Sequence, residues 1–395
     1  MVRAKPDRVS HDRLDGGVTT SVVTRTETEP MPGTHAEQRP VPTKSRAKTA
    51  SDAKPVVEVG IVCDAGTSAT GLHGLSELFG YAGDIAANRH GGKGHSDVRI
   101  TQWRSHNGEV RPGNDTHEGL DHHPDVLVLP GNLPAAMHDT QDPVLTAWLR
   151  QMHARGVIIA AVCGGVFVLA RTGLLQGRQA TTHWALHEKF GQEFPDVLVD
   201  TDYMVIDYGD VMTAGGVLAW ADLGLRIVER LLGPAVMLET AHYMNVDPPG
   251  RQQRFYSEFD PRLKHGDHAI VKAQQFLAGN RTCPISVADL AAQACLEPRT
   301  FLRRFSKATG MKPMEYQQQI RISRAREMLE LTRLGVEEIA GKAGYEDLKN
   351  FRRVFKRIVG LSPSDYRRRF SGDGKESGVR SGAWEPRHQA GQAAD

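Results

Sequence analysis

F-R-R-V-F-K-R-I-V-G-L-S-P-S-D-Y, residues 351–366, repeats a pattern that already occurs at residues 301–316. Six positions recur at a spacing of fifty residues: Phe301, Arg303, Phe305, Gly310, Pro313 and Tyr316 match Phe351, Arg353, Phe355, Gly360, Pro363 and Tyr366. Upstream, Leu290 and Ala291 recur after forty-nine residues as Ile339 and Ala340, so one residue is inserted at the turn. Two copies indicate a duplication, because a solenoid needs three or more repeats.

Each copy predicts a short helix, a tight turn and a second helix. In the first copy, Ser286 can cap the first helix. A turn near residues 295–298 leads to a second helix, with Phe301, Leu302 and Phe305 in its buried stripe. This order predicts a helix-turn-helix, in which apolar residues hold two helices together and the second presents polar side chains to DNA.

The predicted DNA contacts lie on the two second helices and are mainly outward Arg, Lys and Asn side chains, which suit base edges and phosphates. They are Arg299, Thr300, Leu302, Arg303 and Lys307 in the first copy, and Lys349, Asn350, Arg352, Arg353 and Lys356 in the second. Arg304 is also expected to point mainly outward. Leu302 is an exception, because its side chain is apolar and cannot hydrogen-bond to a base. It either contacts a thymine methyl group or packs inward. The alternative is that these basic side chains only form a solvated face. This would explain a single basic helix well, but it explains less well why both copies carry basic side chains at matching positions.

The stretch between the copies has helical spacing over residues 314–332. At 1.5 Å per residue, such a helix is about 28 Å long. Adjacent major-groove faces lie about 34 Å apart. One rigid helix can therefore hold both DNA-contacting helices on one side of a duplex.

Charge divides the chain into two halves although its net charge is only +2. Residues 56–265 carry 16 Lys and Arg against 25 Asp and Glu, whereas residues 266–370 carry 20 against 11. A basic half of this kind indicates a nucleic-acid partner. No apolar run reaches the ~20 residues of a membrane helix, and residues 1–8 lack a signal-peptide core, so we expect a cytoplasmic protein without a membrane partner.

The acidic half alternates short β-branched runs with helical patterns. The predicted strands are residues 56–63, 98–103, 125–130 and 156–163, and the predicted helices include 144–154 and 217–233. This alternation predicts a parallel sheet sandwiched by helices. The expected organisation is a disordered arm (1–54), an α/β domain (55–250), a linker (251–267), an all-α domain with two helix-turn-helix units (268–370) and a disordered tail (371–395).

Cys163 ends a predicted strand and is followed by Gly164, Gly165 and a helical pattern. A thiol at a helix amino terminus can have a lowered pKa, and small residues after it allow the sharp turn of a nucleophile elbow. His183 follows twenty residues later. Catalysis would also need a base with an orienting group, so a cysteine nucleophile, a ligand pocket and a buried packing cysteine remain open at this point. The other cysteines, Cys63, Cys283 and Cys295, show no zinc or disulfide spacing.

Both halves resemble known families. The motifs F-L-R-R-F-S-K-A-T-G-M-K-P and F-R-R-V-F-K-R-I-V-G-L-S-P-S-D-Y-R are similar to the AraC/XylS-type DNA-binding domain over about a hundred residues. In that family the second helix of each unit enters the major groove. The resemblance therefore implies base-reading roles for Arg299, Leu302, Arg303, Lys349, Asn350 and Arg353.

D-V-L-V-L-P-G, V-I-I-A-A-V-C-G-G-V-F and V-M-T-A-G-G-V-L-A-W resemble the PfpI branch of the class I glutamine amidotransferase-like fold. This resemblance places Cys163 at the nucleophile position, His183 beside it, and Gly131 in the loop that would face an oxyanion.

Two departures argue against catalysis. Active glutamine amidotransferases use a histidine and a glutamate at H-x-E late in the domain, whereas the only H-x-E here is His35 to Glu37, in the predicted arm. In addition, Gly71 stands where PfpI-like enzymes carry an acid. Glu77, one helical turn further on, is the remaining acidic candidate. We therefore expect a non-catalytic domain without a cofactor or metal, in which Cys163, His183, Gly131, Gly164 and Glu77 line a ligand pocket. The alternative is a PfpI-type cysteine hydrolase or amidase fused to a DNA-binding domain.

Together the two resemblances imply a bacterial transcription regulator, an activator more often than a repressor, that binds promoter DNA. Relatives respond to amino-acid-derived or quaternary-amine compounds, so the resemblance implies a small-molecule effector of that class. It also implies a homodimer that works with RNA polymerase. A third reading makes the α/β domain only a dimerisation platform.

Overall fold

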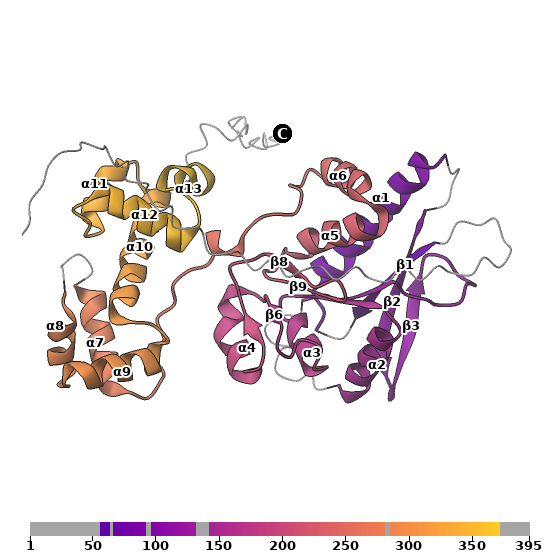
Figure 1. Cartoon of the computed structure of the whole chain (residues 1–395). Helices are drawn as coiled ribbons and strands as arrows, with labels where there is room; N and C mark the ends of the chain where they lie inside the picture. Colours follow the sequence, from indigo (N-terminus) through magenta and orange to yellow (C-terminus); the bar gives the residue numbers. More distant parts are fainter. Residues whose placement is uncertain (1–55, 64–65, 92–95, 132–141, 281–284, 372–395) are drawn as a thin grey trace, which may run out of the picture. The chain divides into compact units, whose positions relative to one another are not determined.

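The computed structural model describes residues 56–63, 66–91, 96–131, 142–280 and 285–371. An α/β region is followed along the chain by an all-helical region, which confirms the predicted fold class (Figure 1). The predicted arm and residues 372–395 of the predicted tail lie outside the described ranges. None of the described helices has the length and apolar character needed to cross a bilayer.

A seven-stranded sheet forms the centre of the α/β region, in the order β3-β2-β1-β4-β5-β9-β8. Its strands are β1 (Val57–Cys63), β2 (Val98–His106), β3 (Glu109–Asp115), β4 (Val126–Leu129), β5 (Ile158–Val162), β8 (Val205–Asp207) and β9 (Val211–Ala214). Neighbours from β2 to β9 are parallel, whereas the edge strands β3 and β8 are antiparallel. The sheet is thus mostly parallel, as predicted, with one antiparallel strand at each edge.

The antiparallel edge at β3 has a local cause in the sequence. The connection between β2 and β3 is only Asn107 and Gly108, both with positive φ, of 52° and 78°. Asn-Gly in this conformation forms the tight turn that joins antiparallel strands. Parallel neighbours need a longer crossover, so this short connection excludes parallel pairing.

Helices cover both faces of the sheet (Figure 1). One apolar cluster joins the sheet to α1 (Ala69–Arg89), α5 (Trp220–Leu232) and α6 (Pro234–Tyr243). A second cluster joins the opposite side chains of the strands to α2 (Pro143–Ala154), α3 (Gly165–Arg171) and α4 (His187–Glu193). A separate parallel pair, β6 (Gln179–Ala180) with β7 (Leu198–Val199), and the short turn η2 (Trp184–Leu186) lie in the connection between α3 and β8. Cys163 directly follows the carboxyl end of β5 and precedes α3.

Seven helices form the C-terminal region as described. They are α7 (His268–Gly279), α8 (Val287–Gln293), α9 (Pro298–Thr309), α10 (Pro313–Leu331), α11 (Val336–Lys342), α12 (Leu348–Val359) and α13 (Pro363–Phe370). Ser286 caps α8 as predicted, through a capping box with Asp289. The two repeats have separate apolar cores, one between α7, α8, α9 and α10 and the other between α10, α11, α12 and α13. The long helix α10 contributes to both cores and so connects the two units.

Candidate nucleic-acid interface and thiol site

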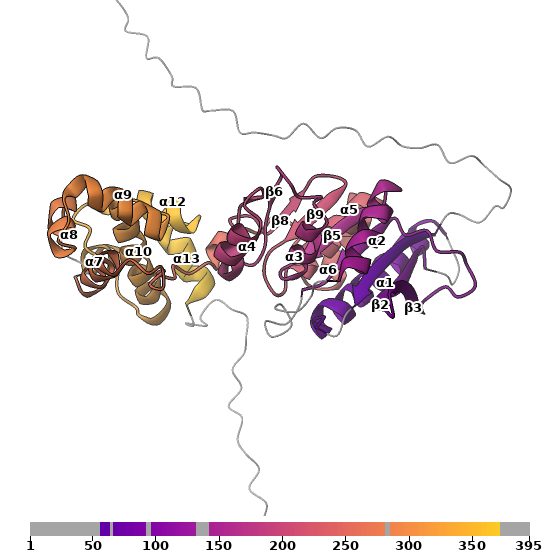
Figure 2. The same cartoon turned by 90° about the horizontal axis from the view of Figure 1, so that it is seen from below.

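The second helices of the two units, α9 and α12, are called the reader helices below. Figure 2 shows both on the same side of α10. The connecting helix has 19 residues, as the sequence predicts with a shift of one residue. At 1.5 Å per residue it is about 28 Å long. This length is close to one turn of B-DNA.

Reader helix α12 presents a polar face that its sequence predicts. Phe351, Val354, Phe355 and Val359 are buried on one side. The predicted contacts Lys349, Arg352, Arg353 and Lys356 are exposed, and Asn350 is partly exposed. Arg353 donates a hydrogen bond of 3.0 Å to Asn350 Oδ1. The two side chains best suited to reading guanine and adenine thus lie in contact with each other.

The amino terminus of α12 is firmly capped. The Asp347 carboxylate accepts hydrogen bonds from the amides of Lys349 (2.9 Å) and Asn350 (3.1 Å). Such a cap satisfies amides that have no partner within the helix. The end of α12 that carries Lys349 and Asn350 is therefore held in place.

Reader helix α9 differs from the prediction at two positions. Arg299, Arg303 and Lys307 are exposed and Thr300 is half-buried. Leu302 is 40% exposed, so it does not belong to the buried stripe, which consists of Phe301, Phe305 and Thr309. Of the two roles left open for Leu302, inward packing is excluded.

Arg304 is the second departure on α9. Its guanidinium pairs with both carboxylate oxygens of Asp267, at 2.7 and 2.9 Å. Asp267 also caps α7 by accepting from the Ile270 amide, and the bond to Arg304 lowers the pKa of this carboxyl. Arg304 therefore connects α9 to α7, which corrects the expectation that it faces outward.

Cys163 forms an elbow between β5 and α3. Its φ of 51° lies in the left-handed region, which costs energy for a residue with a Cβ. Its amide donates to Ala214 O at 2.7 Å on the neighbouring strand. A Cβ added to Gly165 would lie 2.6 Å from Leu129 O, so only glycine fits behind the elbow.

Burial is the main influence on the acidity of the Cys163 thiol. Burial raises its pKa, and the Gly164 backbone hydrogen bond offsets only part of that effect. A cysteine whose pKa is raised contains less thiolate at neutral pH than a free cysteine, and the thiolate is the reactive form. A helix amino terminus can lower a thiol pKa, but at Cys163 the effect of burial is larger.

The predicted ligand residues lie in three different settings. Gly131 is next to the thiol, since a Cβ added there would lie 3.1 Å from Cys163 Cβ, and Gly164 follows in the elbow. The half-buried His183 accepts a hydrogen bond from the Ala185 amide through Nδ1, and burial lowers its pKa. Among the described residues no hydrogen bond joins the His183 ring to the thiol. Glu77 is exposed on α1.

Gly71 occupies the position at which PfpI-like enzymes carry an acid, and it is buried. Gly71 lies in α1, and a Cβ added there would be 3.2 Å from Pro130 Cβ. Pro130 precedes Gly131, which contacts Cys163. An acidic side chain from this position would therefore start close to the thiol loop, and glycine supplies none.

Two buried residues that bond the backbone at Cys163 and around His183 have no signal in the sequence. Thr182 Oγ1 donates to Cys163 O at 2.7 Å. Gln253, in the predicted linker, is only 2% exposed. Its Nε2 donates to Thr182 O (2.9 Å) and its Oε1 accepts from the Trp184 amide (2.8 Å), so it holds both sides of His183. A single polar residue among polar neighbours gives no pattern from which its burial could be predicted.

Comparisons with known proteins match both regions. A helix-turn-helix domain model matches residues 290–369, and the DJ-1/PfpI family model matches residues 104–230. The HTH-type transcriptional regulator ArgR of Pseudomonas aeruginosa is 26% identical over 65% of this chain and 77% of its own length. The HTH-type transcriptional regulator GbdR of Pseudomonas aeruginosa is 27% identical over 67% of this chain and 71% of its own.

An enzyme also resembles part of the chain. The isonitrile hydratase of Pseudomonas putida is 33% identical over 28% of this chain and 46% of its own length. The longer matches are thus to regulators, and the match to an enzyme is confined to a shorter segment.

Proposed function

Because the chain is an AraC-type DNA-binding transcription regulator with a DJ-1/PfpI-type amino-terminal domain, we propose that a small metabolite bound near Cys163 controls its binding to promoter DNA. The pair of reader helices on one side of α10 is the observation that carries this function. In the proposed complex, α9 and α12 enter adjacent major grooves of one duplex. The regulator acts as an activator, as a homodimer that works with RNA polymerase.

The exposed side chains support direct base reading by both helices. Arg303 and Arg353 occupy matching positions in the repeat and are both exposed. Arg is suited to guanine, and Asn350 to adenine. Lysines such as Lys307 and Lys356 suit phosphates, which position the protein without specifying sequence.

Binding rather than catalysis is supported at the thiol. Gly131 leaves no side chain beside Cys163, Gly71 supplies no acid near Pro130, and the raised pKa of the thiol disfavours attack on a substrate. The proposed effector is amino-acid-derived or a quaternary amine. Such a ligand can change DNA binding only if it favours one arrangement of the chain over another. Gln253 bonds to both sides of His183, so the segment that leads to the DNA-binding domain contacts this site directly.

DNA binding is tested with the full chain by fluorescence anisotropy. DNA fragments that the protein selects from a random-sequence library are compared with shuffled fragments of the same composition. We expect roughly 10³-fold or greater preference at physiological salt. Equal affinity for selected and shuffled fragments would show that the basic faces serve only non-specific binding.

The effector is tested by thermal denaturation of the full chain with a panel of amino acids and quaternary amines. A ligand at 100 times its Kd stabilises the folded state by about 2.7 kcal/mol. We expect one ligand class to raise the melting temperature, and the His183→Ala variant to weaken this response. If no compound in the panel stabilises the chain, the dimerisation-platform reading is favoured.

A cysteine hydrolase or amidase is the second candidate, since the elbow at Cys163 and the partial match to isonitrile hydratase favour it. Iodoacetamide labelling, followed by peptide mass spectrometry, separates the two functions. The exposed Cys295 serves as an internal reference. We expect Cys295 to label faster than Cys163 at pH 7, and labelling of Cys163 to rise as pH approaches its raised pKa. Faster labelling of Cys163 at pH 7 would favour the enzyme.

A further inference from the structure

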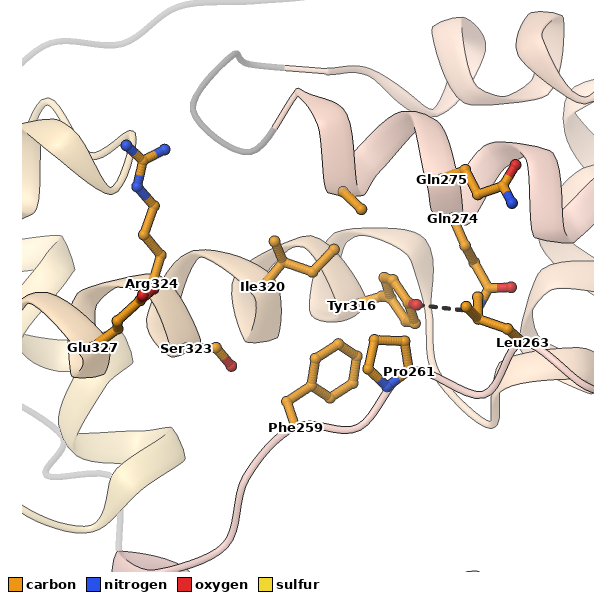
Figure 3. Close-up of a pocket in the computed structure, with 11 residues that line it drawn as sticks. Phe259, Pro261, Leu263, Gln274, Gln275, Tyr316, Ile320, Ser323, Arg324 and Glu327 are labelled. Atoms are coloured by element: carbon orange, nitrogen blue, oxygen red, sulfur yellow. Dashed lines mark hydrogen bonds between the residues drawn. The ribbon is translucent and has the colours of Figure 1, made fainter.

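Two sites in the chain differ in whether a polar group is free to bind a ligand. A cavity of about 300 Å³ lies between α7, α10 and residues 259–263 (Figure 3). Its buried amide, Gln274 Nε2, donates to Arg262 O at 2.8 Å and to Tyr316 OH at 3.0 Å, so both of its hydrogens are engaged. At the thiol site, in contrast, the half-buried His183 has a ring nitrogen, Nε2, that makes no hydrogen bond within the described part of the chain.

The Ala185 amide determines which nitrogen of His183 carries the proton. This amide donates a hydrogen bond of 3.1 Å to His183 Nδ1. A backbone amide can only donate, so Nδ1 must supply the lone pair and carries no hydrogen. In a neutral imidazole one nitrogen is the acceptor and the other is the donor, so the proton lies on Nε2. The free nitrogen of His183 is therefore a hydrogen-bond donor.

Two effects keep the His183 ring neutral. Burial lowers its pKa, and because the ordinary pKa of histidine is about 6.5, a lowered value leaves the ring uncharged at pH 7. A second proton would also have to enter at Nδ1, where it would face the Ala185 N–H and break the hydrogen bond that caps η2. The neutral ring with a proton on Nε2 is thus the form present at neutral pH.

Neighbouring side chains hold this stretch in position. Gln253 bonds to the residues on both sides of His183, to Thr182 O at 2.9 Å and to the Trp184 amide at 2.8 Å. The Trp184 ring lies beside the imidazole, with centroids 5.3 Å apart. Thr182 Oγ1 donates to Cys163 O at 2.7 Å, which attaches the stretch to the elbow. The donor is therefore pre-organised, which lowers the cost of binding.

We propose that His183 Nε2 donates a hydrogen bond to an acceptor oxygen of the effector, either a carboxylate or a carbonyl. The inference rests on the proposed function, because it takes the effector site to be the one at Cys163. A cationic head group without such an oxygen finds no partner on this side chain. The same tautomer prevents His183 from taking the thiol proton, because a general base needs a free lone pair and neither ring nitrogen has one.

Long-range 15N NMR of the full chain, labelled with 15N-histidine, tests the tautomer without any ligand. His183→Gln removes the His183 signals and so assigns them among the 17 histidines. We expect a protonated Nε2 and an unprotonated Nδ1. N,N,N-trimethylglycine and L-alanine should shift the Nε2–H signal, whereas tetramethylammonium and ethylamine, which lack the carboxylate, should not. L-alaninamide has a carbonyl in place of the carboxylate, so its effect distinguishes the two kinds of oxygen.

Two substitutions separate the donor of His183 from its role as a cap. In His183→Asn, Oδ1 takes the place of Nδ1 and accepts from the Ala185 amide, since asparagine is a favoured N-cap residue. In His183→Gln, the side-chain amide takes the place of Nε2–H and donates. We expect the Asn variant to bind trimethylglycine and L-alanine about tenfold more weakly than the parent, the loss of one hydrogen bond to a charged group, and the Gln variant to bind them nearly as well. Isothermal titration calorimetry measures both.

A protonated Nδ1, an equal shift with the probes that lack the oxygen, or binding kept by His183→Asn and lost by His183→Gln overturns the proposal. If a compound of the panel stabilises the chain and moves no His183 signal, the donor assignment fails while the proposed effector control stands. If no compound stabilises the chain, the proposed function fails, and the proposed contact to an effector fails with it. Slower iodoacetamide labelling of Cys163 in His183→Gln would show that the ring acts as a base, which overturns the proposal and favours the hydrolase.

Discussion

The two helix-turn-helix units have the same order of helices but different reader helices. The N-cap residue of α12 is Asp347, whose side chain accepts hydrogen bonds from two amides. The N-cap residue of α9 is Glu297, whose side chain makes no cap hydrogen bond. Along the exposed faces, α12 is polar throughout, whereas α9 presents Leu302 and uses Arg304 in an ion pair with Asp267. The buried phenylalanines, in contrast, are the same in both units. Duplication has thus kept the packing and changed the surface.

The difference indicates a division of labour in DNA recognition. The polar side chains of α12 suit hydrogen bonds to base edges, and the contact between Arg353 and Asn350 restricts them before DNA binds. In α9 the exposed leucine can add only an apolar contact. We therefore expect α12 to supply most of the hydrogen-bonded sequence specificity and α9 to supply a weaker contribution.

The largest expected effect comes from replacing the matching arginines. Arg353→Ala should lower the affinity for a selected promoter fragment by about 1–3 kcal/mol, the range for a bidentate arginine-guanine contact. Arg303→Ala should cost less, because no neighbour on α9 positions its side chain in the described structure. Fluorescence anisotropy on selected and shuffled fragments measures both. An equal loss on shuffled DNA would identify Arg353 as a phosphate contact, and a larger loss for Arg303→Ala would reverse the assignment of the two helices.

Removing the N-cap side chains of the reader helices should affect the stability of the fold, and by less than the arginine substitutions affect DNA binding. Asp347→Ala removes the acceptor for two amides of α12 and should lower the free energy of unfolding by about 1 kcal/mol, within a range of 0.5–2. Glu297→Ala is the matched control in α9 and should change little, since no cap hydrogen bond is lost. Urea denaturation measures the difference. Equal destabilisation by the two substitutions would contradict the asymmetry of the caps.

The contrast between the units also shows how much the sequence could predict. The repeat identified both reader helices, and the apolar spacing identified Phe301, Phe305, Phe351 and Phe355 as core. Spacing alone could not place Leu302, because a leucine next to a buried phenylalanine fits either side of a stripe boundary. The ion pair of Arg304 depends on Asp267, which lies in another helix and gives no local signal.

In the α/β domain the sequence predicted the sharp turn at Cys163, but not the shift in the pKa of its thiol. The run ending at Cys163 and the glycines after it indicate the turn, and the structure has Cys163 at positive φ. The direction of the shift in the thiol pKa could not be predicted from the sequence, because burial depends on neighbours such as Gly131, which is distant in sequence. Gln253 was placed in a linker because the segment around it is polar and contains prolines, although its amide bonds to Thr182 and Trp184.

The turns of the two units differ at the residue that has a positive φ, and this difference can be tested directly. Gly344 has a φ of 84° and Cys295 a φ of 53°, so one unit uses glycine and the other a strained cysteine. Gly344→Ala should lower the free energy of unfolding by about 1 kcal/mol, because it adds a Cβ at positive φ. Cys295→Ala keeps a Cβ and should be nearly neutral. Thermal denaturation of both variants checks this, and a neutral Gly344→Ala would show that the two turns tolerate a Cβ equally.

The smallest expected effect concerns Leu302, and it distinguishes apolar base reading from simple exposure. If Leu302 contacts a thymine methyl group, Leu302→Ala should weaken binding by no more than about 0.8 kcal/mol, the value of one buried methylene. Replacing the contacted thymine by uracil should cause a similar loss in the parent protein and none in the variant, because the same contact is removed. This cycle is measured by anisotropy on fragments with single thymine-to-uracil changes. A loss in the variant that no uracil position reproduces would mean that Leu302 contributes through α9 itself, and the first unit would then lack the apolar contact that separates it from the second.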